Sequence, residues 1–248
     1  MPWLSATTGQ LVENPVDKVD NRQFGLALPV RGPVLGIFAR QPRAGQVKTR
    51  LTPPLRPQEA CALYRVALEE TVRRQSAGPA APVICWTGRG AWFARTFPGV
   101  PLLCQGQGDL GTRLARVTNA LFAASAGPVA VVGSDSPDLP LPLVNAAFAA
   151  LARADIAVIP AVDGGYVLLA LRRPIPALFA DIPWSSAMVL TATRARAAAL
   201  GLRLASVADW DDIDDLAALQ RLLARSPACA TAQYARAHLG NRLWAGGG

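Results

Sequence analysis

The sequence predicts an α/β fold with a mostly parallel, doubly wound sheet that has helices on both faces. Short apolar runs, typical of strands buried on both faces, alternate with longer segments in which apolar residues recur at helical spacing. Of the 248 residues, 51% are hydrophobic and only 17% are charged, so the chain can bury a large core. We therefore expect one large layered domain with extensions.

The predicted elements alternate in a regular order along the chain. In chain order they are a strand over 34–38, a helix over 57–75, strands over 82–86 and 101–104, a helix over 110–124, a strand over 128–132, a helix over 141–152, strands over 155–159 and 166–171, a helix over 188–200, an edge strand over 202–206 and a helix over 215–223. Pro57 suits the first turn of its helix, where the amide hydrogen that proline lacks has no partner anyway.

The two ends of the chain differ from this alternating part. Residues 1–32 mix glycine, proline, asparagine and charges without a clear period, and we interpret them as an N-terminal extension. The main domain is expected over residues 33–225. Residues 226–248 are expected to form a partly helical tail that ends in a flexible glycine run.

The charge pattern favours a small anionic ligand over a nucleic acid. The formal net charge is +8 at pH 7, but the basic residues are scattered and form no long run interleaved with aromatic residues. A positive surface still attracts anionic small molecules. We therefore expect no nucleic-acid partner.

Cysteine and histidine usage excludes several classes of enzyme. The four cysteines form no C-x-x-C pair and His238 is the single histidine, which argues against a Cys/His zinc site and against histidine-based nucleophilic catalysis. No apolar stretch approaches the roughly 18 residues that span a bilayer. The first residues do not resemble a secretory signal, so we expect a cytoplasmic protein without a membrane span.

The most informative segment is the junction at residues 128–140. An apolar run typical of a buried strand ends in the sequence G-S-D-S-P-D-L-P, which carries Asp135 and Asp138. In open α/β sheets ligands bind at the carboxyl ends of such strands, and paired carboxylates there suit Mg²⁺ or Mn²⁺. Helix capping by Ser134, Asp135 or Asp138 is the alternative, but two aspartates at one strand end favour a metal site.

A basic loop follows the first predicted strand. It contains Arg40, Arg43, Lys48 and Arg50, placed where the phosphates of a nucleotide would lie. The loop is neither a P-loop nor a G-x-G-x-x-G fingerprint. Lys48 and Lys18 are the only lysines of the chain, and the compact charge of a lysine suits phosphate oxygens. An exposed basic loop without a ligand remains the alternative.

Three further segments carry weaker signals. The glycine-rich sequence at residues 105–113 allows backbone amides to approach a ligand, although such turns are common. The D-G-G-Y sequence at 163–166 fits a simple hairpin and a substrate contact equally well. Four acidic residues at 211–215 exceed what capping of the next helix needs, so one of them is a candidate for a shared metal site.

Together these segments resemble a bacterial family of uncharacterised function that is labelled as arsenosugar-biosynthesis-type glycosyltransferases, within the GT-A nucleotide-diphospho-sugar transferase superfamily. More distant similarity extends to the 2-phospho-lactate and molybdenum-cofactor guanylyltransferases. The resemblance covers residues 33–225 and implies a Rossmann-like, three-layer α/β/α GT-A fold with a mostly parallel, mixed sheet. The matching motifs, in order, lie at residues 38–53, 108–111, 133–140, 163–166 and 212–214.

Two departures from the family pattern affect the expected site. Arg40 stands where the family usually has lysine, which keeps the charge. Asp215 and Ala218 replace the usual threonine and aspartate of the D-V-D-T-x-x-D-L pattern. A metal role for the preceding aspartates is retained, but the pattern leaves open which of them serves.

The resemblance implies a role for each group of residues. Asp135, with Asp214 or Asp212, would hold Mg²⁺ or Mn²⁺ against the phosphates, while Lys48 and Arg50 clamp phosphate oxygens. Asp138 would orient the metal loop or act as a base. The nucleotide-binding set also includes Arg40, Arg43, Gln105, Gly108, Asp109, Gly111 and Arg113. The sugar or acceptor side is assigned to Asp163, Gly164 and Tyr166.

The implied activity is metal-dependent transfer of a sugar from a nucleotide-diphospho-sugar to a small-molecule acceptor. The alternative is nucleotidyl transfer from a nucleoside triphosphate with release of pyrophosphate, because four cations in the first loop suit a triphosphate. A non-catalytic nucleotide-binding module is the third reading, and the retained acidic residues disfavour it. The sequence does not indicate an oligomeric state.

Overall fold

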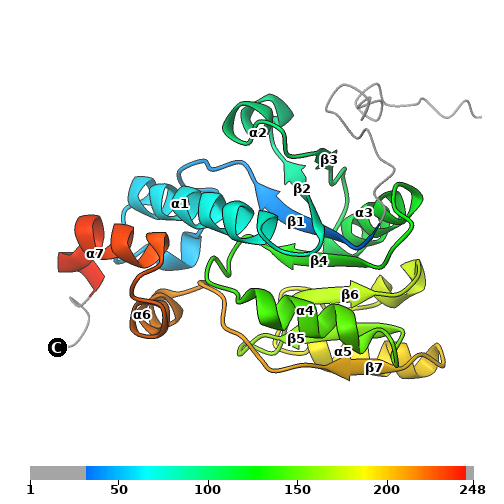
Figure 1. Cartoon of the computed structure of the whole chain (residues 1–248). Helices are drawn as coiled ribbons and strands as arrows, with labels where there is room; N and C mark the ends of the chain where they lie inside the picture. The colour runs from blue at the N-terminus through cyan, green and yellow to red at the C-terminus, as the bar shows by residue number, and fades with distance from the viewer. Residues whose placement is uncertain (1–31, 244–248) are drawn as a thin grey trace, which may run out of the picture.

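The computed structural model describes residues 32–243, and the grey segments of Figure 1, residues 1–31 and 244–248, lie outside the description. The predicted N-terminal extension, apart from Gly32, and the C-terminal glycine run therefore lie outside the described residues.

Seven strands and seven α-helices, with two short 3-10 helices, make up the described residues. They are β1 (Val34–Arg40), η2 (Thr49–Leu51), α1 (Pro57–Ser76), β2 (Ala81–Thr87), α2 (Gly90–Thr96), β3 (Leu102–Cys104), α3 (Leu110–Ala123), β4 (Val129–Gly133), α4 (Leu141–Ala150), β5 (Ile156–Pro160), β6 (Tyr166–Leu171), η3 (Pro176–Phe179), α5 (Val189–Ala199), β7 (Leu204–Ser206), α6 (Leu216–Arg225) and α7 (Ala230–Leu243). Every strand predicted from an apolar run is present, with small shifts at the ends.

The strands form one mixed sheet in the order β3-β2-β1-β4-β6-β5-β7. All neighbouring pairs are parallel except those of β6, which runs antiparallel to both β4 and β5. The predicted mostly parallel, mixed sheet is thus confirmed, and so is the edge position of β7. Because β6 runs backwards, its first residue lies at the same edge of the sheet as the last residues of the parallel strands.

Side chains on the two faces of the sheet pack into two separate apolar layers. Leu35 and Ile37 of β1 belong to the layer beneath α1, α2 and α4, while their neighbour Val34 belongs to the layer beneath α3, η3 and α5. Figure 1 shows α1 and α4 on one face of the sheet and α3 and α5 on the other. This is the three-layer α/β/α arrangement that the sequence predicts.

A third apolar cluster joins α6 and α7 to the outer side of α1 (Figure 1). Glu70 of α1, whose side chain is 1% exposed, accepts hydrogen bonds from the backbone N–H groups of Ala230 and Thr231 at 3.0 and 2.8 Å. The carboxylate thereby satisfies free amides at the N-terminus of α7. The helical part of the predicted tail therefore packs against the main domain.

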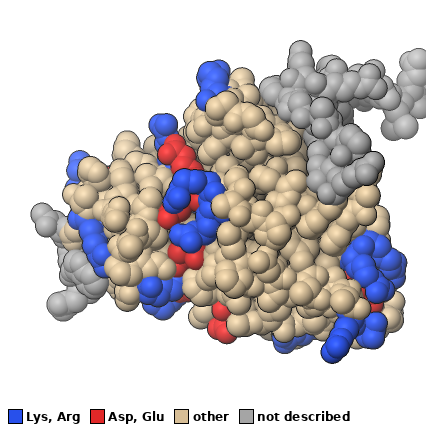
Figure 2. Space-filling model, in the orientation of Figure 1, with Lys and Arg blue, Asp and Glu red and all other residues tan. Residues whose placement is uncertain are grey.

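Charged side chains on the face that carries α1 and α4 are mixed in sign. Figure 2 shows blue and red side chains together in a band over α1 instead of a continuous basic surface. Ion pairs such as Arg65–Glu69, at 2.9 Å, join residues one turn apart on that helix. Within residues 32–243 there is no helix with the length and apolar character needed to cross a membrane.

Candidate functional site

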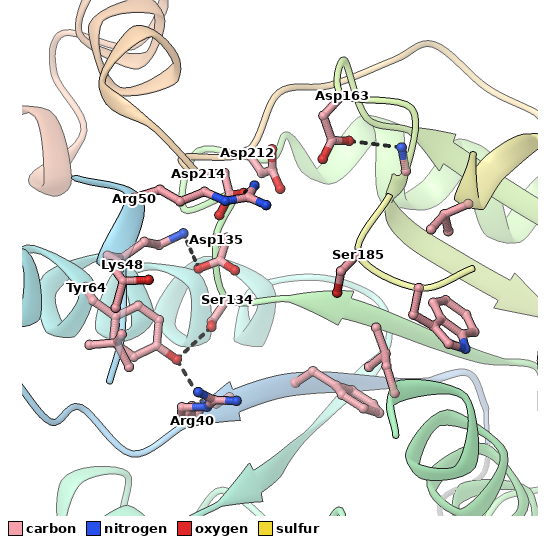
Figure 3. Close-up of a pocket in the computed structure, with 18 of the residues that line it drawn as sticks. Arg40, Lys48, Arg50, Tyr64, Ser134, Asp135, Asp163, Ser185, Asp212 and Asp214 are labelled. Atoms are coloured by element: carbon pink, nitrogen blue, oxygen red, sulfur yellow. Dashed lines mark hydrogen bonds and ion pairs between the residues drawn. The ribbon is translucent and has the colours of Figure 1, made fainter. Parts of the chain in front are cut away.

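A cavity of ≈ 780 Å³ opens at the edge of the sheet where the parallel strands end, and its volume is typical of small-molecule sites. Residues from the ends of β1 and β4, from the loop after β1, from the β5–β6 turn and from two later loops line it (Figure 3). The residues of the predicted site that line this cavity are Arg40, Lys48, Arg50, Gln105, Arg113, Asp135, Asp163, Tyr166, Asp212 and Asp214.

Four aspartates form the acidic end of the cavity. Asp135 follows β4, and its carbonyl accepts a hydrogen bond from the backbone N–H of Ile213 at 2.8 Å, which holds the segment with Asp212 and Asp214 beside the strand end. Burial raises the pKa of Asp212 to about 7, with Asp135 adding to the rise, Lys48 opposing it, and Asp163 and Asp214 adding smaller contributions. The close grouping of these carboxylates thus adds to the effect of burial in disfavouring the charged form of Asp212.

The two cations predicted to clamp phosphates contact these acids. Lys48 Nζ lies 2.7 Å from Asp135 Oδ1 and also donates to the carbonyl of Ile213, and the lysine side chain is only 6% exposed. The Arg50 guanidinium pairs with Asp214 (Figure 3). Lys48 has a positive φ of 49°, so its backbone adopts a left-handed conformation that is uncommon for a non-glycine residue. The loop after β1 is thus fastened to the acidic end.

The acidic end fits a divalent cation by its donor chemistry. Carboxylate oxygens are the preferred ligands of Mg²⁺ and Mn²⁺, and Asp135, Asp212 and Asp214 bring several of them to one end of the cavity. Among residues 32–243, no three His, Cys, Asp or Glu side chains already meet in a metal-binding arrangement. Lys48 supplies part of the positive charge that Asp135 requires.

Two arginines form the basic end of the cavity. Arg113 Nη1 donates to Oε1 of the buried Gln105 at 2.9 Å, and Gln105 Nε2 donates to the carbonyl of Cys85 at 2.6 Å. Burial and the nearby charge of Arg40 lower the pKa of the Arg113 guanidinium. Two cations close enough to affect each other's charge are suited to an anion such as a phosphate.

Other residues of the predicted nucleotide set lie outside the main cavity. Arg43 and Gly108 line a neighbouring cavity of ≈ 360 Å³, which shares Arg40 and Arg113 with the first. Asp109 caps α3 by accepting the N–H of Thr112 at 2.8 Å. A Cβ atom on Gly111 would lie 2.6 Å from the carbonyl oxygen of Phe179 and from Trp184 Nε1. Asp109 and Gly111 therefore have structural roles.

Asp138 is buried away from the cavity. Its carboxylate accepts hydrogen bonds from Arg225 Nε and Nη2 at 2.7 and 2.9 Å and from Ser226 Oγ at 2.7 Å. At 3% exposed it has no access to a ligand in the cavity. Of its two predicted roles, orientation of the metal loop is the one that this geometry supports.

The predicted acceptor residues form a tight turn that borders the acidic end of the cavity. Asp163 Oδ1 accepts the backbone N–H of Gly165 at 2.9 Å (Figure 3), and Gly164 has a φ of 92°. A Cβ atom on Gly164 would lie 2.2 Å from the carbonyl oxygen of Ala187, so glycine is required there. Burial raises the pKa of the Tyr166 hydroxyl, which is enclosed, although the residue lines the cavity.

Sequence reasoning missed several residues of the site. Tyr64 of α1 accepts the backbone N–H of Arg40 at 3.0 Å, and its hydroxyl lies 3.0 Å from Ser134 Oγ, which links β1, α1 and β4 (Figure 3). Burial, followed by the charge of Asp135, raises the pKa of Tyr64 to about 12. The signal available in the sequence was the polar hydroxyl of Tyr64 on the apolar face of the helix predicted over 57–75. The segment at 184–187 lines the cavity and carries no motif.

Comparisons with known proteins agree with this architecture. Residues 71–186 match the family described as uncharacterised proteins conserved in bacteria, DUF2064. A protein from Desulfovibrio desulfuricans G20, provisionally described as a nucleotide-diphospho-sugar transferase, has a TM-score of 0.76 and 28% identity over 84% of this chain and 95% of its own. Among curated proteins no sequence matches the chain.

More distant structures share the fold. A CMP:2-keto-3-deoxy-manno-octonic acid synthetase complexed with CTP has a TM-score of 0.50 and 14% identity, and the match covers 78% of this chain and 97% of the other. The bifunctional IspDF of Campylobacter jejuni has a TM-score of 0.53 and 12% identity over 77% of this chain and 54% of its own. The predicted family resemblance and fold are confirmed, and the chain is similar to nucleotide-utilising transferases.

Proposed function

We propose that this protein is a divalent-metal-dependent glycosyltransferase, which takes a sugar from a nucleotide-diphospho-sugar and passes it to a small-molecule acceptor. The observation that carries the proposal is the division of one cavity into an acidic end at Asp135 and Asp212 and a basic end at Arg40 and Arg113. A nucleotide diphosphate that binds together with a metal ion requires carboxylates to hold the metal and cations to hold the phosphate oxygens, within one cavity. The similar Desulfovibrio protein supports the choice of a sugar donor.

Different residues of the cavity would bind the metal and the phosphates. Asp135, with Asp212 or Asp214, would hold Mg²⁺ or Mn²⁺, which supplies neutralisation of the charge that develops on the leaving diphosphate. Arg40 and Arg113 bind phosphate oxygens, and Gln105 orients the Arg113 guanidinium for that contact. These residues act by orienting the donor and stabilising charge, without forming a covalent bond to it.

A further part of the cavity wall is left for the acceptor. It consists of the turn at Asp163, whose carboxylate is fixed by Gly165, and the segment at 184–187. A small-molecule acceptor and a cytoplasmic location remain predictions from the sequence.

Nucleotidyl transfer from a nucleoside triphosphate is the second candidate, and one observation favours it. The neighbouring cavity continues the basic end past Arg40 and adds the guanidinium of Arg43. This extension provides space and charge for a longer phosphate chain than that of a nucleotide sugar. In that case the acceptor receives a nucleoside monophosphate group and pyrophosphate leaves.

One assay separates the candidates. The purified full chain with Mn²⁺ is incubated with panels of nucleotide sugars and of nucleoside triphosphates, together with candidate acceptors, and nucleoside diphosphate and pyrophosphate are quantified. We expect nucleoside diphosphate release from one nucleotide sugar. Pyrophosphate release from a triphosphate alone would overturn glycosyl transfer in favour of nucleotidyl transfer. Nucleotide binding without turnover over a broad acceptor panel would favour a non-catalytic binding module.

A further inference from the structure

Two cations of the basic loop after β1 pair with two of the aspartates at the acidic end of the cavity. Lys48 Nζ lies 2.7 Å from Asp135 Oδ1, and Arg50 pairs with Asp214 (Figure 3). The Lys48 side chain is 6% exposed, whereas Asp135 is 39% exposed, so the carboxylate has one side against the ammonium and another towards the cavity. The residue expected to bind phosphate is therefore engaged by the residue expected to bind metal.

A divalent ion bound to Asp135 would weaken the contact between this carboxylate and Lys48. A divalent ion on Asp135 would lie close to the ammonium of a nearly buried lysine, and like charges repel strongly where little water screens them. The ion would also neutralise the Asp135 carboxylate, whose negative charge stabilises Lys48 in its present position. Lysine is a compact charge on a flexible stem, so it can move when its counter-ion is lost.

We propose that Lys48 is an exchangeable counter-ion of Asp135, which a divalent metal displaces, so that the freed ammonium turns to the phosphates of the nucleotide. This inference rests on the proposed function of the site and adds a coupling between its two ligands. Because metal binding releases the cation that the nucleotide needs, each ligand strengthens the binding of the other. Arg50, released from Asp214 in the same way, would add to the effect.

If Lys48 has a fixed positioning role, its removal should change the Mn²⁺ affinity in the opposite direction. If Lys48 only holds Asp135 in place for the metal, its removal weakens metal binding. If Lys48 competes with the metal, its removal strengthens metal binding and weakens nucleotide binding only when metal is present. The sign of the change in Mn²⁺ affinity thus separates the two roles.

The test uses Lys48→Met in the full chain, with titration calorimetry. For Mn²⁺ alone, we expect affinity about fivefold higher than in the wild type, since a competing cation is gone. The nucleotide probe is whichever of UDP, GDP, ADP and CDP binds the wild type most tightly. In EDTA its affinity should change by less than about twofold, and with saturating Mn²⁺ it should fall about tenfold. Arg65→Met, which removes an exposed charge paired with Glu69, is the control and should match the wild type.

Asp135→Asn provides a second test that does not depend on the folding of the Lys48 variant. Removing the negative charge frees Lys48 without any metal, so the affinity for the nucleoside diphosphate in EDTA should rise about threefold. A nucleotide affinity that stays equal to that of the wild type, or falls, would overturn the exchange.

The remaining outcomes are equally decisive. An unchanged or lower Mn²⁺ affinity in folded Lys48→Met, or an equal loss of nucleotide affinity with and without Mn²⁺, overturns the inference while leaving the proposed function standing. If the wild-type protein binds neither Mn²⁺ nor any of the four diphosphates, the proposed function itself is wrong and the exchange falls with it.

Discussion

At the scale of single residues, Asp135 is the centre of the site, since its carboxylate contacts Lys48 and its carbonyl holds Ile213. We expect Asp135→Ala to abolish the enhancement of nucleotide binding by Mn²⁺ while the protein stays folded, because the side chain is 39% exposed. Titration calorimetry with and without Mn²⁺, together with circular dichroism, measures both effects. Glu69→Ala on the exposed face of α1 is the control. Unchanged Mn²⁺ dependence would refute the assignment.

Asp212 gives the protein a predictable pH dependence. Its pKa of about 7 lies above the ordinary 3.8, so between these values the folded protein binds more protons than the unfolded chain. The free energy of unfolding therefore falls as pH rises through this window in metal-free buffer. Asp212→Asn removes the effect, so we expect its stability relative to the wild type to grow from near zero at pH 4 to roughly 2–4 kcal/mol at pH 8.

Denaturant unfolding at a series of pH values in EDTA measures this difference. Asp181→Asn is the matched control, because its side chain is 87% exposed, and it should show no growing difference. A difference between Asp212→Asn and the wild type that stays constant with pH would contradict the raised pKa.

The residue types of the site were predictable, but their contacts were not. Asp135 ends an apolar run and Lys48 is a rare lysine, so both were identifiable from local sequence. The contact of Lys48 with the Ile213 carbonyl joins residues 165 positions apart, and no local pattern encodes such a distance. The segment at 184–187 joins the cavity because Gly111 allows Trp184 and Phe179 to approach α3, and that approach depends on tertiary packing.

At the scale of elements, α6 is linked to the loop after β4 by a buried charge network. Arg225 at the end of α6 pairs with Asp138 at 2.7 Å and with Asp211 at 3.1 Å, and its guanidinium stacks over Trp210 at 5.0 Å. Asp138 belongs to the loop after β4, and Asp211 to the segment that carries Asp212 and Asp214. The network therefore fixes the two acidic segments relative to each other.

We expect Arg225→Met to destabilise the protein by about 3 kcal/mol, since it leaves the buried Asp138 carboxylate without its cation. Asp211 keeps its ion pair with Arg221. Denaturant unfolding measures the loss, and Arg65→Met serves as the control. Asp138→Asn combined with Arg225→Met should recover part of it, because one uncompensated charge is then gone. If the double variant is as unstable as the sum of the two single variants, the pair is not the cause.

The strands were the most predictable elements, because buried parallel strands leave continuous apolar runs such as residues 128–132. The helix α2 was missed, since seven residues starting at Gly90 are too few to show a helical period. Asp109 caps α3 because it lies one residue before the helix begins. The same residue also belongs to a glycine-rich segment interpreted as a ligand-binding motif, and that interpretation concealed the capping role.

At the scale of the whole molecule, the family resemblance implied the mixed sheet, whereas the sequence did not indicate how α7 docks. The helix α7 buries Leu239 and Leu243 against apolar residues of α1 and η2, which are nearly 200 positions away in the sequence. Its N-terminus is held by Glu70, which lies at a buried position of α1. The local pattern of residues 226–248 predicts only a partly helical tail, and it indicates neither the apolar contact with α1 and η2 nor the contact with Glu70.

This packing predicts that α7 unfolds together with the sheet domain. Leu239 is 2% exposed, so Leu239→Ala should lower the free energy of unfolding by about 2–4 kcal/mol, through lost apolar contact and a residual cavity. We expect one cooperative transition at a lower denaturant concentration, with coincident curves from circular dichroism and tryptophan fluorescence. Leu200→Ala, at a leucine that is 38% exposed, is the control and should shift the midpoint little. A separate early transition that leaves the main midpoint unchanged would show that α7 unfolds independently, and would support the predicted end of the main domain at residue 225.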